Sequence, residues 1–131
     1  MTGILVLAHG NLAHELVKVA GFILEEDGVA IPVDITPDDP PENIRKRIEE
    51  AISTADQGQG VLILTDLFGG TPSNLGLAFL QEGQVEVVCG VNLPMLIKAL
   101  QHRDLPPREL AALVAEAGRK SIVRSADFFE N

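Results

Sequence analysis

Hydrophobic residues along this chain gather in short continuous runs, separated by stretches of helical periodicity. The runs at 4–8, 61–65 and 85–89 contain few polar residues. A continuous apolar run of this length predicts a parallel strand that is buried on both faces, because a strand with one wet face alternates. A fourth run, at 29–35, is interrupted by Pro32, which predicts an edge strand or a bulge.

Helices are expected in the stretches between these strands. Apolar side chains recur there every three or four positions, as at Ile44, Ile48 and Ile52, which is typical of a helix with one buried face. The expected helices span residues 11–26, 42–55, 71–81, 93–102 and 108–117. Thr71 or Ser73 is expected to cap the third of them, because a hydroxyl group accepts a hydrogen bond from an unpaired N–H group of the first turn.

The order of these elements predicts a doubly wound α/β fold. Two helices precede a short last strand, expected at 121–124, and a loose tail follows at 126–129. This alternation is typical of a mainly parallel sheet, here of about four strands, with helices on both faces. We expect residues 1–131 to form one domain, because a chain of 131 residues buries a sufficient core.

Composition argues against several classes of function. The chain has 10 Lys and Arg against 19 Asp and Glu, a formal net charge of −9, and an acidic surface repels nucleic acid and anionic lipid. All five aromatic residues are Phe, so Trp and Tyr platforms for bases or flavin rings are missing. Apolar stretches are far shorter than the ~20 residues of a membrane helix, and no secretion signal is visible. We therefore expect a cytoplasmic protein without a nucleic-acid partner or direct membrane insertion.

His9 and Asp66 are the first candidate site residues. Each directly follows a predicted buried strand, and the carboxyl ends of parallel strands face the crevice where α/β proteins bind ligands. If the two strands are neighbours, Asp66 accepts a hydrogen bond from one ring nitrogen of His9 and leaves the other nitrogen to act as nucleophile or base. Alternatively, His9 is an ordinary loop residue and Asp66 caps a turn. The flanking glycines and the two strand-end positions favour the chemical site.

The loop after the third strand is suited to binding an anion, and a phosphoryl group is its natural occupant. Phe68 leads into Gly69 and Gly70, which let the backbone approach a ligand closely and direct N–H groups toward it. The hydroxyl group of Thr71 and the start of a helix add further donors. The pattern is neither a Walker loop nor a dinucleotide fingerprint.

Four further residues have a chemical and a structural interpretation. Asn92 follows the strand at 85–89, at the same edge of the sheet, and either donates to a bound phosphoryl group or caps the next helix. His14 is expected to be a solvated surface residue, and His102 to interact with a helix C-terminus. Cys89, the single cysteine, is expected to be a core thiol, because one cysteine forms neither an internal disulfide nor a metal cluster.

Together these motifs resemble the mannose-type IIA component of the bacterial phosphoenolpyruvate-dependent sugar phosphotransferase system. The resemblance covers nearly the whole chain and rests on Ala8-His9-Gly10 and on the segments 65–74 and 90–96, which occur in the family's order. Three separate motifs make it far more specific than any one of them.

The resemblance implies a mechanism, partners and an assembly. His9 is expected to accept a phosphoryl group from the phosphocarrier protein HPr and to pass it to a separate IIB protein. Asp66 matches the acidic residue that holds the histidine, and Thr71 matches the hydroxyl residue after Gly-Gly. Neither a metal nor a cofactor is expected. The family also implies a homodimer that exchanges a C-terminal strand, here near 121–124, and association with a membrane permease complex is compatible with it.

Other functions remain open from the sequence. A phosphoryl-donor subunit of a dihydroxyacetone kinase resembles this family in fold and histidine use, and a non-catalytic regulatory module would use the Gly-Gly-Thr turn only to bind an anion. A receiver domain is disfavoured, because the first strand ends in His9 instead of an acidic pair. A flavodoxin-like carrier lacks the necessary aromatic residues. The sugar, and the choice between transport and regulation, are not determined.

Overall fold

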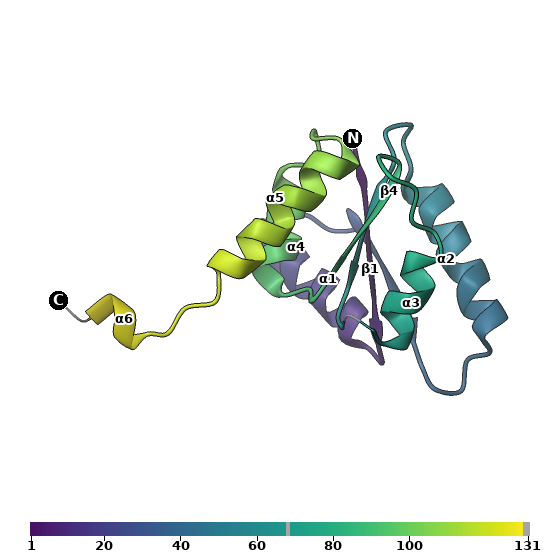
Figure 1. The fold of residues 1–131 in the computed structure, drawn as a ribbon, viewed down its shortest axis with the longest axis horizontal. Coiled ribbons are helices and arrows are strands. Elements are labelled where there is room, and N and C mark those ends of the chain that lie inside the picture. Colours follow the sequence, from purple (N-terminus) through teal and green to yellow (C-terminus); the bar gives the residue numbers. More distant parts are fainter. Residues whose placement is uncertain (68, 130–131) are drawn as a thin grey trace.

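A parallel β-sheet forms the centre of the protein (Figure 1). The structure, a computed structural model, describes residues 1–67 and 69–129. Within these residues the strands are β1 (Gly3–His9), β2 (Ala30–Ile35), β3 (Val61–Thr65) and β4 (Val85–Cys89). They lie in the order β2-β1-β3-β4, and each neighbouring pair is parallel. The predicted arrangement is confirmed, and Pro32 lies on an edge strand, as expected.

Helices cover both faces of this sheet. The described helices are α1 (Leu12–Leu24), α2 (Pro41–Ala55), α3 (Thr71–Leu77), α4 (Leu93–Gln101), α5 (Pro107–Lys120) and α6 (Ala126–Phe129). Helices α1, α4 and α5 pack on one face, and α2 and α3 pack on the other (Figure 1). Among the described residues, no helix is both long enough and apolar enough to span a membrane.

Strand β1 explains why the first apolar run does not alternate. Ile4, Val6 and Ala8 belong to the core cluster under α1, α4 and α5, whereas Leu5 and Leu7 belong to the cluster under α2 and α3. All five side chains are fully buried. A central parallel strand with helices on both faces requires apolar residues at every position, as the sequence pattern predicted.

Helix α3 ends earlier than the sequence pattern predicted. It stops at Leu77 instead of Gln81, because the backbone N–H of Gln81 pairs with the carbonyl of Val85 and turns the chain toward β4. The predicted capping of this helix by a hydroxyl side chain is also wrong. Gly70, which has no side chain to act as a cap, occupies the N-cap position.

The C-terminal segment does not form the predicted strand within a single chain. Helix α5 continues through Gly118 to Lys120, and residues 122–124 then run without regular structure into α6, which replaces the expected loose tail. This segment extends away from the body of the protein (Figure 1). A strand needs a partner, and exchange with a second subunit therefore remains a prediction.

Candidate active site

The register of the sheet brings His9 and Asp66 together at its carboxyl edge. Strands β1 and β3 are direct neighbours, with Leu7 opposite Thr65. Asp66 follows Thr65 at once, while β1 continues to His9. Two residues that are 57 positions apart in the chain therefore meet, as the sequence analysis predicted for neighbouring strands.

A single carboxylate oxygen of Asp66 holds the histidine at two points. The Oδ2 atom lies 2.8 Å from Nδ1 of the His9 ring and accepts a hydrogen bond from the His9 backbone N–H at 3.1 Å. An ionised carboxylate only accepts hydrogen bonds, so Nδ1 carries the proton in the neutral imidazole and Nε2 keeps a lone pair. The histidine side chain is 51% exposed and that of Asp66 only 12%. The geometry thus presents an oriented, accessible nucleophilic nitrogen.

The electrostatics of Asp66 agree with this assignment. Burial alone raises the pKa of its carboxyl group, because a charged group loses hydration. The hydrogen bonds from the side chain and backbone of His9, together with attraction to the histidine, act in the opposite direction. The net result is a pKa below the ordinary value, so Asp66 is ionised at neutral pH and is able to stabilise positive charge on the ring.

The glycine loop lies against the imidazole. Gly69 has a φ of +85°, which favours glycine over other residues. A Cβ atom on Gly70 would lie 3.2 Å from Cε1 of His9, so a side chain at this position would require the imidazole to shift slightly. The N–H of Gly70 donates to the Leu67 carbonyl at 3.4 Å, a long and weak bond. Phe68, which was also predicted to take part, lies outside the described residues.

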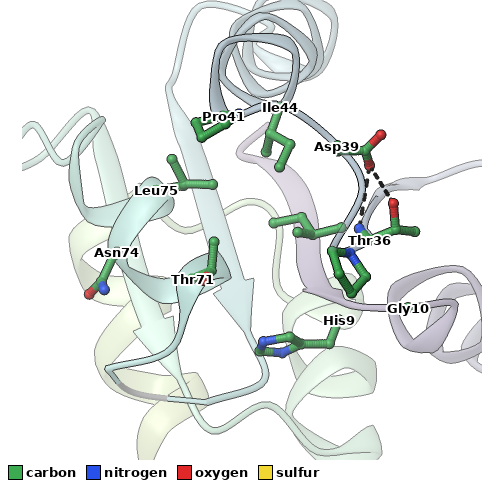
Figure 2. Close-up of a pocket in the computed structure, with 11 residues that line it drawn as sticks. His9, Gly10, Thr36, Asp39, Pro41, Ile44, Thr71, Asn74 and Leu75 are labelled. Carbon is green, nitrogen blue, oxygen red and sulfur yellow. Dashed lines mark hydrogen bonds between the residues drawn. The ribbon is translucent and has the colours of Figure 1, made fainter.

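A cleft of about 680 Å³ opens beside His9. Figure 2 shows the imidazole near its lower end, Thr71 on one side, and Pro41, Ile44 and Leu75 around its upper part. Apart from His9, the cleft is lined by Gly10, Ile35, Thr36, Pro37, Asp39, Pro41, Ile44, Thr71, Asn74 and Leu75. The structure thus places His9 and Thr71 at the same largely apolar cavity, whereas Asp66, which holds the histidine, does not line it.

Several of these lining residues were missed by the sequence analysis. Residues 36–41 were interpreted only as a loop between a strand and a helix, yet Thr36, Asp39 and Pro41 line the cleft. A signal was present: this loop follows the carboxyl end of β2, which neighbours β1. Loops at that edge border the ligand crevice of a parallel sheet.

Asn92 and the other histidines lie outside the lining of this cleft. Asn92 is the N-cap of α4: its Oδ1 accepts from the Met95 N–H at 3.0 Å, and its Nδ2 donates to the Ser121 hydroxyl at 3.3 Å. His14 is exposed and His102 is the C-cap of α4, as predicted. In the described part of the chain, no cluster of three or more His, Cys, Asp or Glu residues has the arrangement of a metal site.

Comparison with known proteins gives a consistent result. A family model described as EIIA-man, "PTS system fructose IIA component", matches residues 3–117. The mannose-specific EIIAB component of Escherichia coli K12 is 34% identical over 122 residues, which are 91% of this chain and 38% of that protein. The chain therefore spans well under half the length of this relative. The fructose-specific EIIA component of Bacillus subtilis is 30% identical over 105 residues, 79% of this chain and 72% of that one.

Solved structures agree with these sequence relatives. The mannose/sorbose-specific IIA subunit from Enterococcus faecalis superposes with a TM-score of 0.82 at 27% identity, covering 94% of this chain and 93% of that one. The EIIA component from Streptococcus agalactiae gives a TM-score of 0.86 at 23% identity, with 97% and 99% covered, and supports the fold. The parallel sheet, the histidine held at its carboxyl edge and these matches lead to one assignment: the chain belongs to the EIIA-man family of phosphotransferase-system IIA components.

Proposed function

We propose that this protein is a phosphoryl carrier and that Nε2 of His9 receives the phosphoryl group. The observation that carries this proposal is the double hydrogen bond from His9 to Asp66, at 2.8 and 3.1 Å. It occupies Nδ1 and leaves Nε2 as the nucleophile. The donor is HPr, in its phosphohistidine form, and the acceptor is a separate IIB protein. Residues 1–131 act as one IIA domain in the cytoplasm, without a metal or cofactor.

The transfer step needs little covalent chemistry from the protein. The Nε2 lone pair attacks the phosphorus of the donor's phosphohistidine, and a new N–P bond forms as the donor's N–P bond breaks. The donor nitrogen leaves with the bonding electron pair, and the proton on Nδ1 stays in place. His9 becomes a phosphoimidazolium, whose positive charge the Asp66 carboxylate stabilises. Transfer to IIB repeats the same step with the roles reversed, so that positioning supplies most of the catalysis.

The loop beside the imidazole is proposed to hold the phosphoryl oxygens. Thr71 lines the same cleft as His9, and Gly70 approaches the ring so closely that a Cβ atom there would lie 3.2 Å from Cε1 of His9. We assign the phosphoryl contacts to the Thr71 hydroxyl and to the backbone of Phe68, Gly69 and Gly70. For Asn92, a phosphoryl contact remains a hypothesis, because both ends of its amide group have partners in the structure.

Labelling tests this function directly. The chain is incubated with labelled phosphoenolpyruvate, enzyme I and HPr, beside His9→Ala and, as a matched control, His14→Ala, which removes an exposed histidine nearby. We expect an acid-labile, base-stable label on the wild type and on His14→Ala only, and a phosphorus NMR signal of the Nε2 isomer. Phosphate binding without a covalent label would instead indicate the anion-binding module. Chasing the label into IIB or into dihydroxyacetone kinase subunits identifies the acceptor class.

We also propose that the protein is a homodimer built through its C-terminal segment. Ile122, Val123, Phe128 and Phe129 are 80%, 49%, 72% and 85% exposed, which is unusual for apolar residues grouped in one short segment. Pairing of residues 121–124 with the exposed edge of a partner's β4 would cover the first two of them. Light scattering on the wild type and on an Ile122→Asp variant tests this proposal. We expect a dimeric wild type and a monomeric variant, and a monomeric wild type would contradict it.

A further inference from the structure

One wall of the His9 cleft is a loop that is closed by its own side chains. Thr36 and Asp39 both line the cavity. The Asp39 Oδ2 atom accepts hydrogen bonds from the backbone N–H of Thr36 at 3.3 Å and from its hydroxyl at 3.0 Å, as Figure 2 shows. The N–H of Asp39 donates back to the Thr36 carbonyl at 3.2 Å. These contacts define the shape of the loop at 36–41, but they do not anchor it to the rest of the protein.

Arg47 supplies that anchor from outside the cleft. This residue lies on α2, and its Nη2 donates to the Asp34 carbonyl at 2.8 Å while its Nη1 lies 3.4 Å from Asp39 Oδ2. The planar guanidinium therefore joins the end of β2 to the middle of the loop. Lysine, with one nitrogen, does not reproduce this fork. Arg47 is 43% exposed and Asp39 34%, so the pair is partly withdrawn from water.

The end of β2 that Arg47 holds is also hydrogen-bonded to the turn that follows His9. The N–H of Gly10, the residue after His9, donates to the Ile35 carbonyl at 2.7 Å. On α1, the N–H of His14 donates to Asp34 Oδ1 at 3.2 Å. Residues 34 and 35 thus connect the His9 turn and the start of α1 on one side with Arg47 on the other. Hydrogen bonds therefore link Arg47, through residues 34 and 35, to the turn that follows His9.

We propose that Arg47 is a positioning residue of the His9 site, which holds the 36–41 loop in the arrangement that the phosphoryl-bearing partner protein meets. This role rests on the phosphoryl-carrier function proposed above. Arg47 does not line the described cleft, so it acts through Asp34 and Asp39. The loop forms a wall of the cleft, whereas the nucleophile is His9. Loss of the Arg47 contacts therefore affects the encounter with HPr more than the chemical step.

The test compares Arg47→Gln and Arg47→Lys with the wild type and with Arg45→Gln. Arg45 is an exposed residue of the same helix, so its replacement removes the same charge without touching the loop. For Arg47→Gln and Arg47→Lys we expect KM for phospho-HPr to rise roughly threefold to fivefold, the effect of losing one hydrogen bond of the guanidinium fork at a partly exposed site. We expect kcat to change less than KM. Hydrogen exchange at the Thr36 amide should accelerate in both variants, while Arg45→Gln changes neither quantity.

Several results would overturn this role. The first is an Arg47→Gln variant with an unchanged KM, and the second is a loss of activity confined to kcat. The third is an Arg47→Lys variant with the KM of the wild type, which would mean that the positive charge alone suffices. Exchange of the buried Ile63 amide reports whether each variant is folded, and the conservative Arg47→Lys change keeps the test valid if Arg47→Gln is unstable. A wild type that accepts no label overturns the carrier function itself. A labelled wild type with an unaffected Arg47→Gln variant overturns only the role of Arg47.

Discussion

Replacing Asp66 by asparagine should slow phosphorylation of His9 without misplacing the ring. Both hydrogen bonds to the side chain, at 2.8 and 3.1 Å, end on the same oxygen, Oδ2. Because both partners are donors, an asparagine at this position turns its carbonyl oxygen toward them. The proton then stays on Nδ1, and the lone pair of Nε2 is retained. The substitution removes the negative charge and preserves the orientation of the imidazole.

The magnitude follows from the kind of hydrogen bond that is lost. A hydrogen bond to a charged group contributes about 1.5–3 kcal/mol, and a neutral one about 1 kcal/mol. The difference, about 0.5–2 kcal/mol, is added to the activation free energy, because positive charge develops on the ring in the transition state. It corresponds to a transfer rate reduced roughly twofold to thirtyfold. Asp66→Ala removes both hydrogen bonds and the orientation with them. For that variant we expect a reduction on the order of a hundredfold or more.

Rapid-quench measurement of single phosphoryl transfer from labelled HPr gives these rates. Asp56→Asn is the matched control: Asp56 also accepts two backbone N–H bonds, from Gly58 and Gly60, but it precedes β3 and lies at the opposite edge of the sheet. It should leave the transfer rate unchanged. An Asp66→Ala variant that transfers as fast as the wild type would refute the role of Asp66 in the transfer step. An Asp66→Asn variant as slow as Asp66→Ala would show that the amide turns its NH₂ group toward the histidine.

Four further predictions concern the same site and its surroundings. Gly70→Ala should slow transfer on the order of tenfold, because its Cβ would lie 3.2 Å from the His9 ring. Chemical denaturation should show little loss of stability, since the φ of Gly70, −82°, is one that alanine also adopts. The pKa of Asp66 is lowered in the folded protein, so in acid the unfolded chain binds more protons than the folded one. The stabilisation is therefore present above the ordinary carboxyl pKa and is lost as pH falls through the folded value. Thermal unfolding measured from about pH 6 to pH 3 should show a smaller loss of stability in Asp66→Asn than in the wild type. Asn92→Ala should lower the free energy of unfolding by about 1 kcal/mol, because the N-cap of α4 is lost. If Asn92 also binds the phosphoryl group, an Asn92→Ser variant will keep the stability of the wild type but transfer the phosphoryl group more slowly. With a net charge of −9, transfer from a basic face of HPr should slow as ionic strength rises, and a flat response would exclude electrostatic steering.

The central part of the site could be predicted because it depends on strand ends. His9 and Asp66 each directly follow a buried run, and a parallel sheet brings such strand ends to one edge. The contacts of Arg47 could not be predicted in this way. They depend on how α2 packs beside β2, and helical periodicity identifies the buried face of a helix without indicating what its polar residues reach.

Two of the differences between the predicted and the observed fold have a similar origin. Residues 71–81 have continuous helical character, but the pairing of Gln81 with Val85 ends the helix early. Ile122 and Val123 have the β-branched side chains typical of strands, yet a strand forms only where a neighbouring strand offers its backbone groups. Both outcomes depend on contacts between segments, which local patterns do not contain.

The outer edge of β2 has a consequence for how this sheet is able to grow. The Ile35 carbonyl points inward to Gly10, so the alternate residues Pro32 and Asp34 present their backbone groups outward. Pro32 has no N–H to offer an incoming strand, and the Asp34 carbonyl is already bonded to Arg47. This side of the sheet is therefore protected against edge-to-edge aggregation. Any added strand, whether from a second subunit or in an aggregate, is directed to β4.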